Sequence, residues 1–299
     1  MARVVVTGGA GKLGRACVTE LAAHGWDVVV FDRVRPARLP GEVARGLTVV
    51  PMELTDYAQV LDAMLGLEEH YDRIDAVVHL AAIPAPGIVG DHATFTANMS
   101  VTFNVFSAAR RAGVKNIVWA SSETVLGLPF ETPPPYIPVD EEYPSRPEST
   151  YSLTKTLEEE LARQLCRWDP GLKMLGLRFS NVMEPADYAA FPSFDADPRQ
   201  RKWNLWAYID ARDGAQAVRL ALEHQATGMD LFIIANADTV MQRSNAELVA
   251  EVFPDVEVRG DLGEHDTLLS IDKARRVLGF DPRHSWRGQV GPGADGETA

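Results

Sequence analysis

The chain has 299 residues and carries 29 Lys and Arg against 42 Asp and Glu, which gives a formal net charge of −13. This acidic balance argues against a nucleic-acid-binding protein, because such proteins usually present a basic face. Hydrophobic residues make up 46% of the chain, which excludes a disordered protein, and no apolar run is long enough to span a bilayer. We therefore expect a globular protein with neither a nucleic-acid nor a membrane partner.

Short β-branched runs alternate with longer helical patterns along most of the chain. Strands are predicted at Arg3–Thr7, 27–31, 47–51, 76–80, 116–120, 172–178 and 231–235, and helices at 13–24, 57–67, 94–112, 148–168, 213–224, Asn245–Val252 and 271–278. Apolar strands separated by helices indicate a parallel sheet that is covered on both faces. The predicted fold class is therefore α/β, a doubly wound Rossmann-type parallel sheet with a small C-terminal substrate lobe.

The second half of the pattern is less regular and suggests how the domains divide. Residues 129–147 are so rich in proline that they must form a loop, which we expect to wrap a site. The dinucleotide-binding domain is expected to comprise residues 1–181 and 205–236, and the small lobe residues 182–204 and 237–287. The Gly-rich residues 288–299 are expected to be a disordered tail.

Cysteine and histidine usage bears on compartment and metal content. Cys17 and Cys166 provide neither a disulfide framework nor metal-ligand spacing. The apolar stretch near the N-terminus runs into glycines too early for a signal-peptide core. His79 lies in an apolar strand and is expected to be a core histidine with satisfied hydrogen bonds. We expect a cytoplasmic protein without a bound metal.

A glycine pattern follows the first strand and opens the first helix. Gly8, Gly11 and Gly14 stand at three-residue spacing within TGGAGKLG. Gly8 allows a tight turn, Gly11 lets the backbone approach a pyrophosphate, and Gly14 lets helix and strand pack closely. The anion would rest on the amides of the helix N-terminus. The alternative, a glycine turn in an unrelated sheet, is weakened by the strand and helix on either side.

An acidic residue, Asp32, ends the second predicted strand. A carboxylate there can accept hydrogen bonds from an adenosine ribose and repels a 2′-phosphate, which favours NAD over NADP. The opposite preference stays open, because three basic residues stand nearby, at Lys12, Arg33 and Arg35.

A tyrosine and a lysine, Tyr151 and Lys155, stand one helical turn apart and so share a face. A free tyrosine is a poor base at neutral pH, but a nearby ammonium favours the phenolate. Tyr151 would then take a proton from a substrate hydroxyl while a hydride leaves the same carbon. Ser122 follows the 116–120 strand at the carboxyl edge of the sheet, where its hydroxyl can hold the substrate oxygen. By itself such a pair also arises by chance on amphipathic helices.

An ordered series of motifs connects these features. TGGAGKLG is followed by VVHLAA at 77–82, NMSVTFN at 98–104, ASSETVLG at 120–127, YSLTK at 151–155, LRFSNVMEP at 177–185 and YIDARD at 208–213. In this order the chain resembles the extended short-chain dehydrogenase/reductases, the NAD-dependent epimerase/dehydratase family, from residue 3 to about residue 287. Four positions depart from the family pattern, at Val101, Leu126, Met183 and Glu184.

The resemblance assigns roles and partners. It implies Ser122 as the active-site hydroxyl, Tyr151 as general acid/base and Lys155 as its assistant. It implies NAD as cofactor, bound by Gly8, Gly11, Lys12, Leu13, Gly14, Asp32, Glu53, Leu54, Leu80, Ala81, Ala82, Asn98, Tyr151 and Lys155. It also implies a homodimer in which helices 94–112 and 148–168 pair with those of a second copy. The substrate would be a small sugar-type molecule.

The reaction that follows hydride transfer stays open. Relatives divide into epimerases, dehydratases and simple dehydrogenases, and the dehydratases carry an Asp-Glu pair where this chain has Glu123 and Thr124. Glu123 is either a useful acid or a structural group. Substrate contacts are expected from Ser122, Glu123, Thr124, Asn181, Arg199 and Arg212. A non-catalytic NAD(P)-sensing regulator is a further alternative, although such proteins usually lose the tyrosine or the lysine.

The substrate side is short, with few residues between LRFSNVMEP and YIDARD. This length favours a compact substrate, a free sugar or a sugar acid as in the related uronate dehydrogenases, over a nucleotide sugar. Against it stand Arg199, Arg201 and Lys202 beside Trp203 and Trp206, since arginines bind phosphate or carboxylate and aromatics stack on a base or a sugar. These basic residues are either a site for an anionic substrate or a solvated rim.

Overall fold

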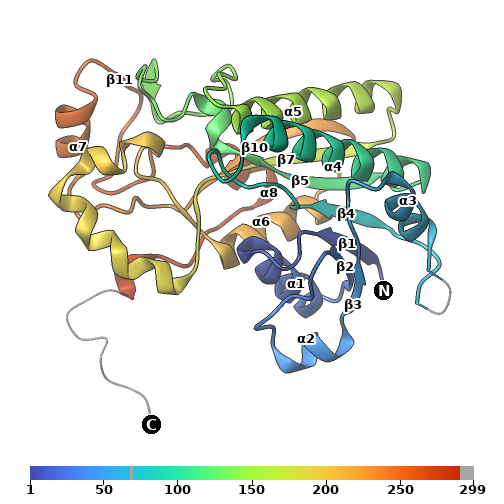
Figure 1. Ribbon diagram of the computed structural model, residues 1–299. Helices are drawn as coiled ribbons and strands as arrows, with labels where there is room; N and C mark the ends of the chain where they lie inside the picture. Colours follow the sequence, from blue (N-terminus) through green and yellow to red (C-terminus); the bar gives the residue numbers. More distant parts are fainter. Residues whose placement is uncertain (68–69, 290–299) are drawn as a thin grey trace, which may run out of the picture.

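One parallel sheet forms the centre of the protein, of which the computed structural model describes residues 1–67 and 70–289. Its strands lie in the order β10-β7-β5-β4-β1-β2-β3, and every neighbouring pair is parallel (Figure 1). The strands are β1 (Arg3–Thr7), β2 (Asp27–Asp32), β3 (Thr48–Pro51), β4 (Ala76–His79), β5 (Asn116–Ser122), β7 (Lys173–Phe179) and β10 (Gly228–Ile234). The order reverses direction between β1 and β4, so the prediction of a doubly wound α/β fold is confirmed.

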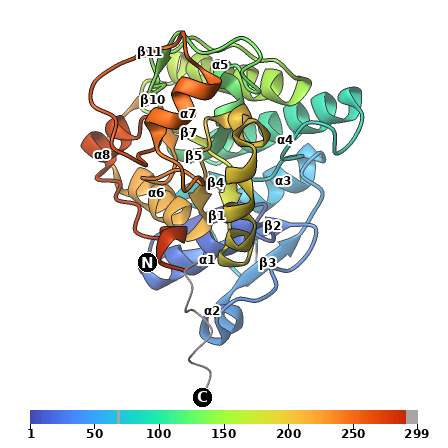
Figure 2. The same cartoon turned by 90° about the vertical axis from the view of Figure 1, so that its left-hand side faces the viewer.

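Helices cover both faces of the sheet. On one face lie α1 (Lys12–Ala23), α6 (Ala211–Glu223) and α8 (Asp272–Leu278), and on the other α3 (Tyr57–Leu65), α4 (Asp91–Arg111) and α5 (Thr150–Trp168) (Figures 1 and 2). Side chains alternate along each strand, so Val4 and Val6 enter the core beneath α1 and α6, whereas Val5 enters the core beneath α3 and α4. Both faces of the strands are buried, which explains their near-continuous apolar sequence.

The segments predicted to form the substrate lobe pack onto the end of the sheet. They contain η2 (Pro185–Ala196), η3 (Pro198–Gln200), η4 (Lys202–Asn204) and α7 (Asn245–Val252), which face the viewer in Figure 2. Two short strand pairs tie them down, β8 (Val182–Met183) with β9 (Ile209–Asp210), and β6 (Tyr136–Ile137) with β11 (Glu257–Val258). Tyr188 and Phe191 of the lobe share one apolar core with the sheet and α6. The division into two domains stays a prediction.

The predicted boundaries differ from the structure mainly at short elements. Neither α2 (Gly41–Gly46) nor the two-residue strands were predicted, because elements so short show no clear periodicity. The predicted start of α4 was residue 94, whereas Gly90 caps the helix and Asp91 stands in its first turn. Of the predicted tail, residues 290–299 lie outside the described residues, while Gly288 ends the short helix η5 (Trp286–Gly288). Within the described part of the chain, no helix is both long and apolar enough to cross a membrane.

Candidate active site

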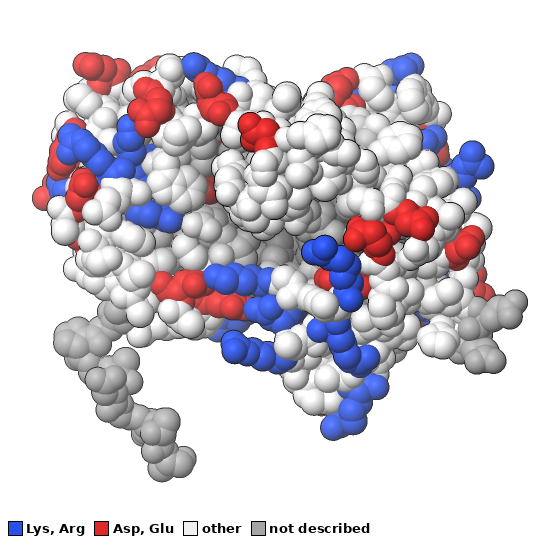
Figure 3. All heavy atoms as spheres, viewed as in Figure 1, with Lys and Arg blue, Asp and Glu red and all other residues white. Residues whose placement is uncertain are grey.

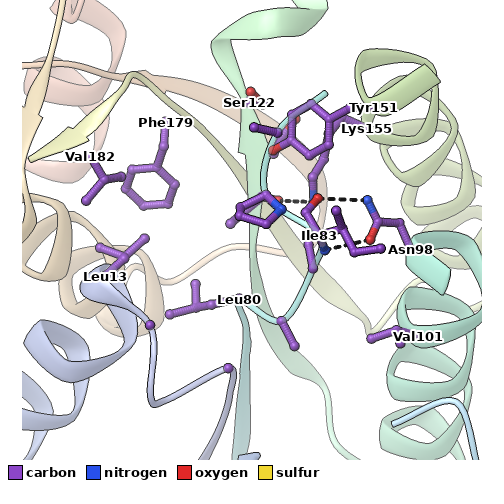
Figure 4. A pocket seen from close by; sticks show the side chains of 18 of the residues that line it. Leu13, Leu80, Ile83, Asn98, Val101, Ser122, Tyr151, Lys155, Phe179 and Val182 are labelled. Carbon is purple, nitrogen blue, oxygen red and sulfur yellow. Dashed lines mark hydrogen bonds between the residues drawn. The ribbon is translucent and has the colours of Figure 1, made fainter. Parts of the chain in front are cut away.

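A cavity of about 1150 Å³ lies at the carboxyl ends of the strands, where open α/β sheets bind ligands. It is lined by every residue predicted to bind the cofactor, namely Gly8, Gly11, Lys12, Leu13, Gly14, Asp32, Glu53, Leu54, Leu80, Ala81, Ala82, Asn98, Tyr151 and Lys155. Of the residues predicted to bind substrate, Ser122, Glu123, Thr124 and Asn181 also line it. Figure 4 shows Leu13 of α1, Ser122 of β5, and Tyr151 and Lys155 of α5 around this cavity.

The glycine loop is packed too closely for side chains. Gly8 has a φ of +71°, and a Cβ there would lie 2.7 Å from the backbone nitrogen of Ala81. A Cβ on Gly14 would lie 2.2 Å from the carbonyl oxygen of Gly8. Gly8 thus forms the turn and Gly14 lets α1 approach the loop, as the sequence analysis predicted for each.

The outer side of the loop fits the phosphates of a dinucleotide. Gly11 begins α1 without a side-chain cap, and the first amides of a helix lack partners within the helix. A Cβ on Gly11 would meet only one described backbone atom within 4 Å, the Gly8 carbonyl oxygen at 3.5 Å, so the loop is open on this side. These amides can therefore bind an anion.

Asp32 fits the ribose end of the same ligand. Its carboxylate accepts a hydrogen bond from the backbone of Ala10 at 3.0 Å and another from Val34 at 3.2 Å. It therefore joins the glycine loop to the end of β2 and still lines the cavity. Figure 3 shows Lys and Arg side chains gathered below the central hollow, over the α1 and α2 region. An acidic protein thus presents a locally basic rim beside an expected anionic ligand.

Two asparagines of α4 hold the loops that follow β3 and β4. Asn98 accepts a hydrogen bond from the Ile83 amide at 2.8 Å and donates to the Ile83 carbonyl at 3.1 Å (Figure 4). Asn104 donates to the carbonyls of Leu54 and Thr55, both at 3.0 Å. Both side chains fix the cavity wall through backbone groups, and Asn98 also lines the cavity.

Tyr151 and Lys155 are placed by the start of α5. Ser149 and Ser152 form a capping box, in which each side chain accepts a hydrogen bond from the other residue's backbone N–H. The helix therefore begins just before Tyr151, which points toward Ser122 at the end of β5 (Figure 4). Lys155 Nζ lies 5.9 Å from the centre of the Tyr151 ring. The three predicted catalytic residues thus meet at one wall.

Ser122 is oriented to donate its own proton. Its oxygen accepts hydrogen bonds from the backbone N–H of Thr124 at 3.2 Å and from the Thr124 hydroxyl at 3.0 Å. With its lone pairs engaged by Thr124, the Ser122 hydroxyl keeps its proton for the Tyr151 oxygen, whose pKa it lowers, or for a substrate oxygen. Thr124, predicted to bind substrate, acts here on Ser122.

Burial opposes the phenolate of Tyr151 more strongly than the sequence analysis assumed. Burial raises the pKa of Tyr151 above its ordinary value, although the ammonium of Lys155 and the hydroxyl of Ser122 act to lower it. Lys155 does favour the phenolate, as expected, but in the protein without cofactor the effect of burial is larger. The positive charge of an oxidised nicotinamide would act in the same direction as Lys155.

Glu123 lies deep at the substrate end of the cavity. It is 3% exposed, and its Oε1 accepts a hydrogen bond from Asn204 Nδ2 at 3.1 Å. Burial raises its pKa to about 8, against the lowering effects of Asn204 and Arg201. At neutral pH Glu123 is therefore mostly a neutral acid that joins β5 to the lobe.

Two arginines, one in the lobe and one on α6, lie away from the cavity wall where substrate contacts were expected. Arg199 and Arg212, predicted to contact substrate, lie outside the lining of the cavity. Arg199 Nη1 lies 2.8 Å from Glu251 Oε1, and Arg212 binds Asp210 through two nitrogens at 2.8 Å each. Each guanidinium has a carboxylate of the protein within direct reach and so is not a free anion site.

The neighbouring cations are engaged as well. Arg201 is buried between two rings, 5.2 Å from the centre of Phe194 and 4.8 Å from that of Trp203. Lys202 Nζ lies 3.5 Å from Glu131 Oε2. The choice between a site for an anionic substrate and a solvated rim stays open for these residues, and Arg199, Arg201 and Lys202 each have a partner within the protein.

Several lining residues were not predicted individually. Leu128 and Pro129 at one end of the proline-rich loop, and Glu148 and Ser149 just beyond its other end, line the cavity. Of the loop itself only Pro129 is among the lining residues, so its wrapping of a site stays a prediction. Trp203 also lines the cavity, whereas Trp206 is buried and donates to the Pro198 carbonyl at 2.8 Å. Sequence could propose both tryptophans, but only packing distinguishes the wall from the core.

His79 is a core residue, as predicted. Its ring nitrogens lie 2.7 Å from Thr7 Oγ1 and 3.1 Å from Thr102 Oγ1. Among the described residues, no group of three or more His, Cys, Asp or Glu is arranged to hold a metal ion.

Two ion pairs join the glycine-loop helix to the lobe. Lys12 Nζ lies 2.6 Å from Asp187 Oδ2, and Arg15 Nη2 lies 2.7 Å from Glu184 Oε1. Lys12, predicted to contact the cofactor, therefore lines the cavity while bound to η2.

The chain is similar in sequence to proteins of known family. The model of the NAD dependent epimerase/dehydratase family matches residues 4–235. UDP-glucose 4-epimerase 2 of Oryza sativa is 31% identical over 219 residues, 69% of this chain and 50% of that protein. UDP-glucose 4-epimerase of Mus musculus is 30% identical over 226 residues, 70% of this chain and 61% of that protein. The chain thus spans about half to three fifths of the length of these curated relatives.

Solved structures agree with the fold. A short-chain dehydrogenase/reductase superfamily protein from Agrobacterium tumefaciens, with bound NAD, is 27% identical with a TM-score of 0.68, and the match covers 95% of this chain and 94% of that one. A UDP-galactose 4-epimerase is also 27% identical, with a TM-score of 0.67 and the same coverage.

Proposed function

The chain belongs to the NAD-dependent epimerase/dehydratase family, and from that premise we propose that it is an NAD-dependent oxidoreductase acting on a hydroxyl of a sugar or sugar derivative. Membership confirms the resemblance to extended short-chain dehydrogenase/reductases and the prediction of NAD as cofactor. The observation that carries the proposal is the meeting of Tyr151, Lys155 and Ser122 at the wall of a cavity that begins at the glycine loop.

The residues divide the proton chemistry among them. NAD, when bound, accepts the hydride that leaves the hydroxyl-bearing carbon of the substrate. Ser122 donates a hydrogen bond to the reacting oxygen, and Tyr151 takes that oxygen's proton, so that the alcohol becomes a carbonyl. Lys155 stabilises the phenolate form of Tyr151 before the proton arrives.

The test of this function is Tyr151→Phe. Loss of the phenolic oxygen should lower kcat by about 10²- to 10⁴-fold, the usual contribution of a general acid/base, while NAD binding is retained. Initial rates with a panel of sugars, sugar acids and nucleotide sugars measure the first effect, and titration with NAD measures the second. Wild-type rates in Tyr151→Phe would overturn the mechanism, and NAD binding without turnover on any panel member would favour a sensing regulator.

The substrate we favour is compact, a free sugar or sugar acid oxidised with net release of NADH. The observation behind this choice is that Arg199, Arg201, Lys202 and Arg212 are all engaged with protein groups, so the lobe offers no free cation from this set to a diphosphate. The alternative is a nucleotide-sugar epimerase, the activity that the names of the relatives above describe. NADH absorbance separates the two, because net oxidation accumulates NADH whereas epimerisation regenerates NAD.

We also propose a homodimer through α4 and α5, the pairing that the resemblance implies. These helices pack side by side and expose large apolar side chains, at Phe95 and Phe103 on α4 and at Leu153 and Leu157 on α5. Such a patch on a folded protein suits a protein partner. Sedimentation equilibrium tests the proposal, and a mass equal to one chain at micromolar concentration would contradict it.

A cytoplasmic location is proposed from the thiols. Cys17 and Cys166 are both free and buried. Burial raises the pKa of Cys166 to about 11, so its unreactive thiol form prevails. Free thiols suit a reducing compartment, and localisation of a tagged chain would test this.

A further inference from the structure

Among the buried carboxylates that the mechanism above leaves unused, one touches Lys155. Glu158 lies one turn after Lys155 on α5 and is 0% exposed. Lys155 Nζ donates to Glu158 Oε2 at 2.9 Å and to the Ala120 carbonyl of β5 at 2.9 Å. The ammonium is therefore held between a helix and a strand by two acceptors.

The next carboxylate along the helix has a different partner. Glu159 accepts hydrogen bonds from Arg178 at 2.9 Å through both of its oxygens and from the Ser121 hydroxyl at 2.6 Å. Within residues 1–67 and 70–289, Glu158 is the carboxylate that pairs with Lys155. The two glutamates are equally deep in the protein but serve different cations.

The remaining groups around the pair are mostly uncharged. On α4, the Thr102 hydroxyl lowers the pKa of Glu158 and is a hydrogen-bond partner of His79 on β4. Burial, assisted by Lys155, lowers the pKa of His79 to about 3, so this ring is neutral at neutral pH. The titratable groups that face the pair are Tyr151 and Glu159 on α5, Glu123 at the start of η1 (Glu123–Leu126) and His79 on β4.

The charges have opposite effects on the two working groups. Burial lowers the pKa of Lys155, but Glu158, together with Tyr151 and Glu159, outweighs this effect and raises that pKa above its ordinary value. Burial raises the pKa of Tyr151, Lys155 lowers it, and Glu158 raises it again by offsetting part of the lysine's charge. A counter-ion 2.9 Å from the ammonium therefore weakens the field that the phenol experiences.

We propose that Glu158 is a positioning residue that anchors the Lys155 ammonium against Ala120 and, by offsetting its charge, sets the pH range in which Tyr151 exchanges a proton. The inference rests on the proposed function, since it assigns that role to Tyr151. It predicts that removal of the carboxylate moves the proton exchange of both Tyr151 and Lys155 to lower pH.

The test uses Glu158→Gln in the NAD-saturated protein, with Glu159→Gln as the matched control. The first readout is the pH dependence of kcat/KM on the responding substrate. The second is the tyrosinate ultraviolet absorbance against pH, from which the curve of the same protein carrying Tyr151→Phe is subtracted. The second readout needs no turnover, so a failure of the proposed function and a failure of this inference can be told apart.

We expect both limbs of the Glu158→Gln profile to move to lower pH by about one unit, the shift typical for loss of an adjacent opposite charge. Glu159→Gln should shift by much less and act mainly on stability. Glu158→Asp moves the carboxylate one methylene further from Lys155, so its pH profile should shift in the same direction by a smaller amount. If Glu158→Gln does not fold, Glu158→Asp serves as the test variant. Profiles and tyrosinate curves that superimpose on wild type, or an equal shift in Glu159→Gln, would overturn the inference.

Discussion

The cofactor end and the substrate end of the cavity are built on different principles. At the cofactor end, the glycine loop and Asp32 interact through backbone groups that neighbouring strands bring together. At the substrate end, the contacts run between side chains far apart in sequence, as between Glu123 and Asn204. At the cofactor end, the backbone is packed so closely that an added side-chain atom would clash. At the substrate end, the structure depends on which charged or polar side chains interact with one another.

This difference explains why the two ends respond to different perturbations. Where two backbone segments are in close contact, neither can move aside locally. An added methyl group must therefore displace a whole helix or strand. A buried carboxyl group can instead change its protonation state, and an exposed ion pair can exchange its partner for water. Three changes, from the largest expected effect to the smallest, test whether the distinction holds.

The largest effect is expected from Gly14→Ala at the cofactor end. The new Cβ would lie 2.2 Å from the Gly8 carbonyl oxygen and 2.7 Å from the Gly9 Cα, both of which are backbone atoms. We expect the free energy of unfolding to fall by at least about 2 kcal/mol, with loss of NAD binding. Urea denaturation and NAD titration measure the two effects.

A helical glycine elsewhere provides the control for this change. Gly46 ends α2, and a Cβ there would meet no described atom within 4 Å. Gly46→Ala should alter the free energy of unfolding by less than about 1 kcal/mol. Equal effects of the two substitutions would show that close backbone approach is not what limits the glycine loop.

An intermediate effect is expected from Glu123→Gln at the substrate end. Burial raises the pKa of Glu123 to about 8. The stability that this group contributes is therefore complete below the unfolded pKa of about 4.3 and is lost as pH rises toward the folded pKa. Over this range the free energy of unfolding of wild type should fall relative to Glu123→Gln, by at most about 1.4 kcal/mol per pH unit.

Urea denaturation at a series of pH values from about 5 to about 8 measures this difference. Glu131→Gln serves as the control, because it removes the same charge from a side chain that is 77% exposed. Parallel curves for wild type and Glu123→Gln would contradict a neutral buried acid at this position.

The smallest effect is expected at the border between the two ends, from Asp187→Asn. The change removes the charge that Lys12 binds at 2.6 Å but keeps an acceptor for the Glu184 backbone N–H. Because both side chains of the ion pair are substantially exposed, the free energy of unfolding should fall by less than about 1 kcal/mol. The difference in the free energy of unfolding between the two proteins should vanish at high salt. A difference that persists at high salt would show that the pair contributes more than a screened electrostatic attraction.

The cofactor end could largely be read from the sequence. The regular alternation of apolar runs and helical patterns predicts the parallel sheet, and the glycines, Asp32, Tyr151 and Lys155 stand at spacings that one strand or one helix converts directly into positions. Each residue predicted to bind the cofactor does line the cavity. The few errors, such as α2 and the start of α4, fall where an element is too short to show a period or where its cap decides the boundary.

Tertiary structure alone decided the chemistry of the side chains at the substrate end. Sequence shows that Arg199 and Arg212 are cations, but not that Glu251 and Asp210 bind them. It shows that Glu123 is an acid, but not that burial keeps it protonated. The three-residue spacing of Lys155 and Glu158 places them side by side on a helix, but only the fold buries the pair against β5. The physical reason is distance: backbone patterns repeat along the chain, whereas charges act through a few ångströms of space that only the folded chain defines.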